Sequence, residues 1–482
     1  MKKLILNICL VSSLFFINSC GRDFEEINTD TSKIKNPSVG SLLAPIQFEM
    51  GSYNYKRAND LTFDFMQVAL DFPNEGNSYS RYYLSEASGN GFWNNSYKWL
   101  KQVKDLEQAA TKVNNNNYLA ISKVMKAWLY SNLTDAFGDI PYSEANKMDE
   151  GIMKPKFDTQ KDIYLDLLNE LKVANALFET NKVLSDTDLF FNANNDSNGI
   201  LKWKKFANSL SLRLLTRILN KNGEIDVHAR INEIVNNPTE YPIFESNDDS
   251  AVLQLSGIAP FLPPIARPQD FTAGRAAGEF FVNLMTDNND PRMALFFTKA
   301  KKLSNNSTIG YKGAPSGYAY GTVFDYQPSN MNQNLAKAPL SVLLLSYSEV
   351  QFILAELSLK GIISGNTKTY YEKGVTSIIE QWKTVVPADY FNNPKLAYNG
   401  TLEQIMTQKY LSLFFVDHQQ WYEYKRTGFP QLPNNGGLLN DGKMPRRFQY
   451  PISTKVMNPE NYNAAAANIG GDNINSKTWW EN

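Results

Sequence analysis

Cysteine is nearly absent from this chain of 482 residues. Both cysteines, Cys9 and Cys20, lie at the N-terminal end, and the long remainder has no thiol. This absence excludes a disulfide framework, a cysteine-ligated metal site and a cysteine nucleophile from the body of the protein. Because 43% of the residues are hydrophobic, a chain of this length can instead be stabilised by a large apolar core.

Histidine is equally scarce. The chain carries only His228 and His418, and neither belongs to an HExxH motif, so a zinc hydrolase site has no support. His418 follows a helical pattern and is interpreted as a structural or surface residue. The GxxxxGK[ST], GxGxxG and GxSxG patterns are also missing, which removes the usual signs of a P-loop, a Rossmann cofactor site and a serine hydrolase. We therefore predict no catalytic residue and no cofactor.

The chain also lacks an excess of basic residues. Its 48 Lys and Arg balance 49 Asp and Glu, which leaves no basic footprint for a nucleic acid. The many acids keep a glycoside hydrolase open as an alternative, because such an enzyme needs only two carboxylates that meet in space. Acid-rich turns at 247–249 and 287–290 offer oxygen ligands for calcium, but they lack the spacing of an EF-hand and are interpreted as solvated turns.

No apolar run reaches the length of about 20 residues that a membrane-spanning helix needs. The longest, Leu4–Ile17, follows two lysines and predicts a signal peptide over residues 1–19. Its end, Ile17-Asn18-Ser19-Cys20, resembles a bacterial lipobox, so Cys20 is predicted to carry a lipid, with residues 20–38 as anchor and tether. Multiple acyl chains anchor a protein stably. The alternative is an ordinary secretory signal with an incidental cysteine.

What the chain does have is helical periodicity. Residues such as Ile121, Val124, Met125 and Trp128 recur on one helical face. Comparable stripes fall into two groups, at about 95–220 and 340–428. One stripe follows a capping-box-like start at Thr159, another begins at Leu343, and a third is predicted as a single helix that starts at Thr401 and ends at Gly428. Strand-like alternation is rare, and 250–255 is the clearest example. We predict a mainly α single domain over 39–482, built from stacked helix pairs.

Aromatic residues make up 13% of the chain, and many lie outside the helical stripes. They concentrate at about 50–100 and 222–339, among Asn, Ser and Gly, while the tail 429–482 is irregular. An aromatic ring can stack on the face of a sugar, and nearby amides can bond its hydroxyls. Ligand pockets combine aromatic walls with a few placed polar groups, so the two regions together predict a binding surface. For any single ring, packing of a loop onto the body is the alternative.

Several blocks of the sequence, in order along nearly the whole chain, resemble one known family. They are YSNLTDAFGDIPYSEA (130–145), PKFDTQKDIYLDLLNEL (155–171), LKWKKFANSLSLRLLTRI (201–218), PLSVLLLSYSEVQFILAEL (339–357), QKYLSLFFVDHQQWYEYKRTGFPQL (408–432) and MPRRFQYP (444–451). Together they are similar to the SusD/RagB family of outer-membrane nutrient-binding lipoproteins, in its SusD-like second branch. Within these blocks, Glu349 and Glu356 lie on an apolar helix, and five arginines are candidate partners: Arg213, Arg217, Arg426, Arg446 and Arg447.

The resemblance implies a tetratricopeptide-like helix-pair superhelix with a loop-rich insertion that carries the ligand face. It implies a non-catalytic surface lipoprotein that captures an oligosaccharide or a peptide and passes it to a SusC-like TonB-dependent barrel transporter in the outer membrane. The alternative functions are an exported glycoside hydrolase and a structural scaffold of an outer-membrane complex. In relatives the binding aromatics come from the two aromatic regions, which here predicts six ligand-binding residues: Phe72, Tyr79, Tyr82, Trp93, Tyr318 and Tyr320.

Overall fold

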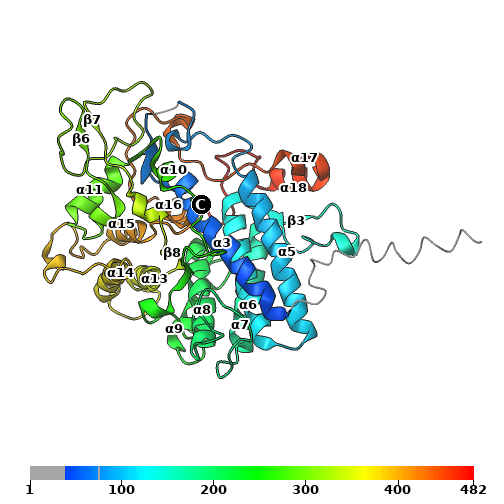
Figure 1. Cartoon of the computed structure of the whole chain (residues 1–482). Helices are drawn as coiled ribbons and strands as arrows, with labels where there is room; N and C mark the ends of the chain where they lie inside the picture. Colours follow the sequence, from blue (N-terminus) through cyan, green and yellow to red (C-terminus); the bar gives the residue numbers. More distant parts are fainter. Residues whose placement is uncertain (1–37, 74–75, 482) are drawn as a thin grey trace, which may run out of the picture.

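A computed structural model describes residues 38–73 and 76–481 (Figure 1). The predicted signal peptide, Cys20 and all but the last residue of the predicted tether lie outside these ranges. The prediction of a mainly helical protein is confirmed. The longer helices are α3 (Leu43–Arg57), α5 (Asn90–Lys112), α6 (Asn116–Phe137), α7 (Gln160–Leu177), α8 (Gly199–Arg217), α9 (Val227–Asn236), α11 (Glu279–Asp287), α13 (Tyr347–Leu359), α14 (Thr367–Gln381), α15 (Leu402–Ser412), α16 (Gln419–Thr427) and α18 (Pro459–Asn468). The shorter ones are α4 (Phe63–Phe65), α10 (Pro268–Thr272), α12 (Met293–Phe296) and α17 (Ile452–Met457).

Two groups of packed helices form the body. In the first, α5 packs on α6, α6 on α7 and α7 on α8, and in the second α13 packs on both α14 and α15. The first group fills the lower right of Figure 1 and the second lies to its left. Helices α8 and α13 join the two groups. The groups coincide with the two regions of helical periodicity.

Most predicted helix ends are confirmed. The side chains of Thr159 and Thr401 cap α7 and α15 by accepting the backbone N–H groups of Asp162 and Gln404. Gly428, with φ of 76°, ends α16 in the left-handed region that glycine adopts without strain.

The prediction of one continuous helix from Thr401 to Gly428 is wrong. Helix α15 ends at Ser412 and α16 begins at Gln419. In the intervening turn, Phe415 has φ of 63° and its ring stacks on Tyr55 of α3 at 3.8 Å between centroids. Asp417 of the same turn forms an ion pair with Arg57 at the end of α3. These tertiary contacts outweigh the local helical preference.

Short antiparallel strand pairs connect segments that are distant in the sequence. The predicted strand at 250–255 is confirmed as β4 (Ala251–Leu255), which pairs with β8 (Leu340–Leu345). The prediction that Leu343 begins a helical stripe is wrong, because this apolar run forms the mostly buried strand β8 and α13 starts only at Tyr347. The other pairs are β1 (Ala69–Asp71) with β5 (Arg275–Ala277), β2 (Ile140–Pro141) with β3 (Phe157–Asp158), and β6 (Lys301–Lys302) with β7 (Tyr326–Gln327).

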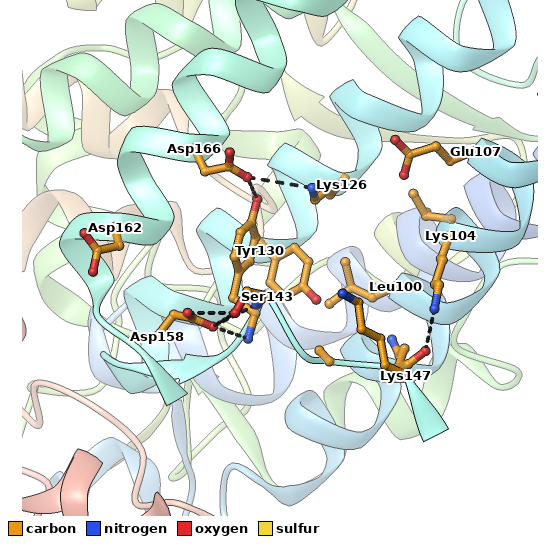
Figure 2. Close-up of a pocket in the computed structure, with 14 residues that line it drawn as sticks. Leu100, Lys104, Glu107, Lys126, Tyr130, Ser143, Lys147, Asp158, Asp162 and Asp166 are labelled. Carbon is orange, nitrogen blue, oxygen red and sulfur yellow. Dashed lines mark hydrogen bonds and ion pairs between the residues drawn. The ribbon is translucent and has the colours of Figure 1, made fainter. Parts of the chain in front are cut away.

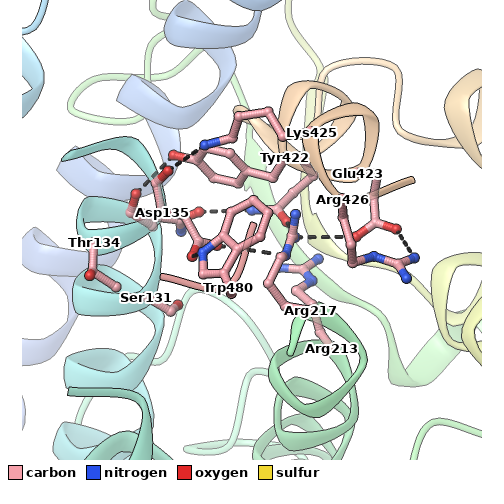
Figure 3. Close-up of polar contacts among 12 residues, drawn as sticks. Ser131, Thr134, Asp135, Arg213, Arg217, Tyr422, Glu423, Lys425, Arg426 and Trp480 are labelled. Carbon is pink, nitrogen blue, oxygen red and sulfur yellow. Dashed lines mark hydrogen bonds and ion pairs between the residues drawn. The ribbon is translucent and has the colours of Figure 1, made fainter. Parts of the chain in front are cut away.

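A buried ion network links the two helix groups (Figure 3). Glu423 of α16 lies 3.4 Å from Arg217 of α8, 3.0 Å from Lys409 of α15 and 2.6 Å from Arg426 of its own helix. Arg426 also forms a bidentate pair with Glu356 of α13, at 2.7 and 2.6 Å. The prediction that arginines pair with the acids of this helix is confirmed for Arg426 and for Arg213, which pairs with Glu349 in the same way. The other three candidate arginines pair with other acids: Arg217 with Glu423, Arg446 with Glu481 and Arg447 with Asp472.

The network extends to the C-terminal end of the chain. Asp135 of α6 accepts hydrogen bonds from the Tyr164 hydroxyl at 2.6 Å and from the Trp480 indole at 2.8 Å. Lys425 donates to the backbone oxygens of Asp135 and Arg446. The irregular tail is therefore attached to the helical body by hydrogen bonds to buried charges.

Burial and the neighbouring cations act in opposite directions on Glu423. Burial alone would raise its pKa, but Arg426, Lys409 and Arg217 together hold the pKa well below its ordinary value. Because the folded-state pKa is depressed, this carboxylate stabilises the fold above its unfolded pKa, and the contribution is lost as the pH falls through the folded pKa.

We expect Glu423→Gln to lower the free energy of unfolding at pH 7 by about 3–5 kcal/mol, because it leaves buried cations uncompensated. Urea unfolding measures this change. Glu403→Gln, at an exposed position of α15, is the matched control and should stay within about 0.5 kcal/mol of the wild type. Equal stabilities of the two variants would contradict the role assigned to the network.

Candidate functional site

The two aromatic regions, far apart in the sequence, meet in the fold. Strand β1 pairs with β5, and Gly278, directly after β5, forms a β-bridge to Ala314. This pairing brings Phe72 against Tyr318 and Phe324 of the central insertion. The ring centroids of Phe72 lie 6.4 Å from Tyr318 and 5.3 Å from Phe324, and those of Tyr318 and Phe324 lie 5.2 Å apart. We call these three residues the Phe72 cluster.

The C-terminal tail completes the same surface. The guanidinium of Arg81 donates to the backbone oxygen of Gly437 at 2.5 Å, and the N–H of Gly437 donates to the oxygen of Gly317 at 2.8 Å. Three loops are thereby hydrogen-bonded side by side, near the upper edge of Figure 1. We refer to them as the loop face, which comprises residues 72–83 with the exception of 74–75, residues 313–326 and residues 431–442.

The six predicted ligand-binding residues differ in accessibility. Tyr320 is 69% exposed, and its ring lies beside Gly76. Phe72 and Tyr79 are partly buried. Tyr82, Trp93 and Tyr318 are less than 9% exposed. A ligand can therefore stack directly on Tyr320, whereas the three buried rings mainly serve internal packing.

Trp93 belongs to a different aromatic group from the Phe72 cluster. It lies on α5, and its ring packs against Phe137 at 5.0 Å and Tyr450 at 6.0 Å between centroids. It lines a cavity of about 250 Å³ together with Phe157 and Met457. Within the part of the chain that the structure describes, no ring contact joins Trp93 to the Phe72 cluster.

Two carboxylates near the Phe72 cluster are held by one cation. Arg275 of β5 donates to Asp64 at 2.9 Å and lies 3.8 Å from Asp71 of β1. Asp64 is only 1% exposed. Burial raises the pKa of Asp64 to about 7, against the opposing effect of Arg275. The pair resembles the acid arrangement of a hydrolase in composition, but Asp64 is buried and its role is to hold β5 to the segment before β1.

A cavity of about 160 Å³ lies next to the loop face, at the end of α3. Its aromatic walls come from Tyr53, Tyr79 and Phe92, and Arg57 and His418 supply polar atoms. A π-helical turn, Ala58–Thr62, directly follows α3 here. Such turns are frequent at functional sites.

Arg57 is fixed in this cavity by two hydrogen bonds and two ring contacts. Its Nε donates to Asp417 at 2.6 Å, and its Nη2 donates to the second oxygen of the same carboxylate. Its guanidinium lies over the rings of Phe92 and Tyr53, at 4.3 and 4.9 Å from their centroids. Its Nη1 has no hydrogen-bond partner among the described residues.

His418 can be assigned a tautomer from its neighbour. The Thr62 hydroxyl donates to the backbone oxygen of Asp417 at 2.9 Å, so it must accept from Nδ1–H of His418, which lies 2.7 Å away. Nε2 is then an acceptor, and it has no partner among the described residues. Burial lowers the pKa of His418 to about 3, so the ring stays neutral.

Nη1 of Arg57 and Nε2 of His418 are thus a donor and an acceptor without a partner among the described residues, and both atoms are buried. Sequence reasoning missed Arg57, because its partner Asp417 lies 360 residues away. The interpretation of His418 as a structural residue agrees with its burial, since only 1% of the residue is exposed. The break between α15 and α16 that places it here is not visible in the periodicity.

Among residues 38–73 and 76–481, no group of three or more His, Cys, Asp or Glu side chains is arranged to hold a metal ion. The acid-rich turns predicted as solvated instead pair with internal cations, Asp249 with Lys205 and Asp290 with Arg292. Over the same residues, no helix combines the length and apolar character needed to cross a membrane.

Comparison with known proteins gives a consistent result. The profile of the second SusD-like family, described as "Starch-binding associating with outer membrane", matches residues 30–451. No functionally curated protein matches the sequence.

Solved structures share the fold over nearly the whole chain. A chitin-binding protein superimposes with a TM-score of 0.79 at 26% identity, covering 92% of this chain and 100% of that one. A SusD homologue from Bacteroides fragilis has a TM-score of 0.77 at 26% identity, with coverages of 90% and 98%. A SusD homologue from Bacteroides uniformis shares the fold at 24% identity, with a TM-score of 0.77 and coverages of 93% and 100%.

We expect His418 to make the protein less stable in acid. Between its ordinary pKa of 6.5 and its folded value of about 3, the unfolded chain binds a proton that the folded chain does not. Stability therefore falls as the pH drops through this range, by about 3 kcal/mol between pH 7 and 4. In His418→Gln, the free energy of unfolding should not show this loss of about 3 kcal/mol. Urea unfolding at pH 7 and at pH 4 measures the difference.

His228→Gln, which removes the other histidine, is the control and should retain the wild-type pH dependence. A His418→Gln variant that loses as much stability as the wild type over this range would show that the depressed pKa is wrong.

Proposed function

This chain belongs to the SusD-like family of starch-binding, outer-membrane-associated proteins, and on that premise we propose that it captures an oligosaccharide at its loop face without cleaving it. The single observation that carries this proposal is the exposed ring of Tyr320 on a surface where two aromatic regions, far apart in the sequence, meet. The ring suits the apolar face of a sugar.

Two comparisons support a saccharide as the ligand. The family description and the chitin-binding protein of similar fold both concern saccharides. A peptide ligand is the second candidate, because aromatic-lined grooves also bind extended peptides. Of the six predicted residues, we assign direct contact to Tyr320, Phe72 and Tyr79, and internal packing to Tyr82, Trp93 and Tyr318.

We further propose that the protein is anchored in the outer membrane through a lipid on Cys20 and faces the cell surface. From there it hands the captured ligand to a SusC-like TonB-dependent barrel transporter. The support is the family membership together with the lipobox-like end of the signal segment. A weak, open site suits this role, because a ligand that must be passed on has to leave again.

We expect the wild type to bind one class of oligosaccharide on a glycan array, and Tyr320→Ala to bind it about tenfold more weakly. A stacked aromatic pair is worth about 0.5–1.5 kcal/mol beyond its buried area, and 1.4 kcal/mol corresponds to tenfold. Titration calorimetry on the best glycan measures the difference. Val385→Ala removes an equally accessible apolar side chain, 84% exposed, from the connection after α14 and should bind like the wild type.

Unchanged glycan affinity in Tyr320→Ala would place the site elsewhere. Binding on a peptide array with none on the glycan array would instead favour the peptide ligand.

We expect no turnover of the bound ligand. Prolonged incubation of purified protein with the best oligosaccharide, followed by chromatography of the sugars, should return the ligand intact. The reason is that Asp64, one of the two acids near the Phe72 cluster, is buried against Arg275 and cannot reach a glycosidic bond. Shorter sugars that appear with the wild type but not with Asp71→Asn would support the hydrolase alternative.

A further inference from the structure

A second cavity lies on the helical body, apart from the residues of the loop face. It has a volume of about 470 Å³, within the range of about 300–1,000 Å³ typical of ligand sites. Helices α5, α6 and α7 and the segment from β2 to β3 surround it (Figure 2). No predicted ligand-binding residue lines it.

One side of this cavity is acidic. Asp158 of β3 and Asp162 and Asp166 of α7 lie together on it, opposite Lys104 in Figure 2. Asp162 and Asp166 are four residues apart on one helix, a spacing at which like charges repel each other. Asp162 accepts a hydrogen bond from Thr159 but forms no ion pair within the described residues.

The lysines that line the cavity already have acidic partners outside its lining. Lys126 donates to Glu170 at 2.7 Å, while its distance to Asp166 is 3.8 Å. Lys104 donates to Glu150 at 3.2 Å and to a backbone oxygen at 2.9 Å. The cations are thus compensated. On the acidic side, Asp158 pairs with Lys156 at 3.2 Å and Asp166 lies 3.8 Å from Lys126, so among these three acids Asp162 is the one without an ion pair within the described residues.

The side chain of Tyr130, on α6, is a second indication of a ligand site, and it is independent of these acids. Its side chain lines the cavity and is only 5% exposed as a residue. Its ring packs edge-on against Tyr142 at 4.5 Å between centroids. The Tyr142 hydroxyl donates to Asp166, whereas that of Tyr130 has no hydrogen bond within the described residues. Figure 2 shows Tyr130 between the acidic side and the lysines.

Part of the remaining lining is apolar. Leu100 and Val103 of α5 and Ala145 contribute carbon surface beside the ring of Tyr130. The cavity thus combines an apolar wall, a hydroxyl without a hydrogen bond and, in Asp162, a carboxylate without an ion pair within the described residues. A metal ion does not match this set, because these acids form no group of three that could ligate one.

We propose that this cavity binds an organic cation, a primary ammonium group on an apolar stem. The stem lies along Leu100, Val103 and the ring of Tyr130, and the ammonium donates to the acidic side and to the Tyr130 hydroxyl oxygen. A primary ammonium group occurs in a lysine side chain of a peptide, on an apolar stem, and on an amino sugar, where the C–H face of the ring would take the place of the stem.

Titration calorimetry of the full chain tests the proposal with three probes. Nα-acetyl-lysine methylamide should bind, and Nα-acetyl-norleucine methylamide, which has the stem but lacks the ammonium, should bind at least tenfold more weakly. Glucosamine is the third probe. Binding of only the lysine probe identifies a peptide source, and binding of only glucosamine identifies an amino sugar.

Two conservative variants locate the site. Tyr130→Phe removes only the hydroxyl, and Asp166→Asn removes the charge but keeps an acceptor for Tyr142. Each variant should lower the affinity for the ammonium probe by about tenfold, because hydrogen bonds to charged groups are stronger than those between neutral groups. Asp105→Asn is the matched control, since it removes an exposed acid of α5 that pairs with Lys101 outside the cavity. Raising the salt to 0.5 M should weaken binding too.

The proposal is overturned if neither ammonium probe binds, if the norleucine probe binds as tightly, or if both cavity variants bind like Asp105→Asn. Tyr320→Ala should leave this binding unchanged, so the result is independent of the function proposed for the loop face.

Discussion

The fold depends on the burial of one carboxylate, Glu423, among cations that come from different helices. Arg217 of α8 and Lys409 of α15 meet this acid, and Arg426 connects it to Glu356 of α13. Each partner is buried, so none can be removed without leaving an uncompensated charge. The network therefore fixes the position of the first helix group relative to the second. Apolar packing alone would define this relative position less sharply.

The same principle extends to the functional surface. The pairing of Arg57 with Asp417 holds the end of α3 to the turn between α15 and α16, and this turn positions His418. The pairing of Arg275 with Asp64 holds β5 close to the segment that precedes β1. Because these loops are tied to buried charges of the body, the aromatic rings of the loop face keep a defined arrangement before any ligand binds. Preorganisation of this kind reduces the entropy that binding would otherwise cost.

Local patterns in the sequence predicted much of the body but little of the site. Helix stripes and the caps at Thr159 and Thr401 depend on neighbours within a few residues, and they were predicted correctly. The break at Phe415 and the strand at Leu343 depend on distant partners, Tyr55 and β4, and were missed. At the site, composition predicted two aromatic regions that do meet. It could not separate the exposed ring of Tyr320 from the buried ring of Trp93, because exposure is decided by the packing of α5 against segments far along the chain.

The central claim is that the loop face, rather than the helical body, captures the nutrient. Hydrogen exchange of the full chain, with and without the oligosaccharide that binds best, tests it most directly because amide protection reports where a ligand orders the backbone. The account predicts slower exchange at 76–83 and 313–326 and little change in α5 to α8. Protection confined to the helices around Tyr130, or no protection at either loop, would contradict it.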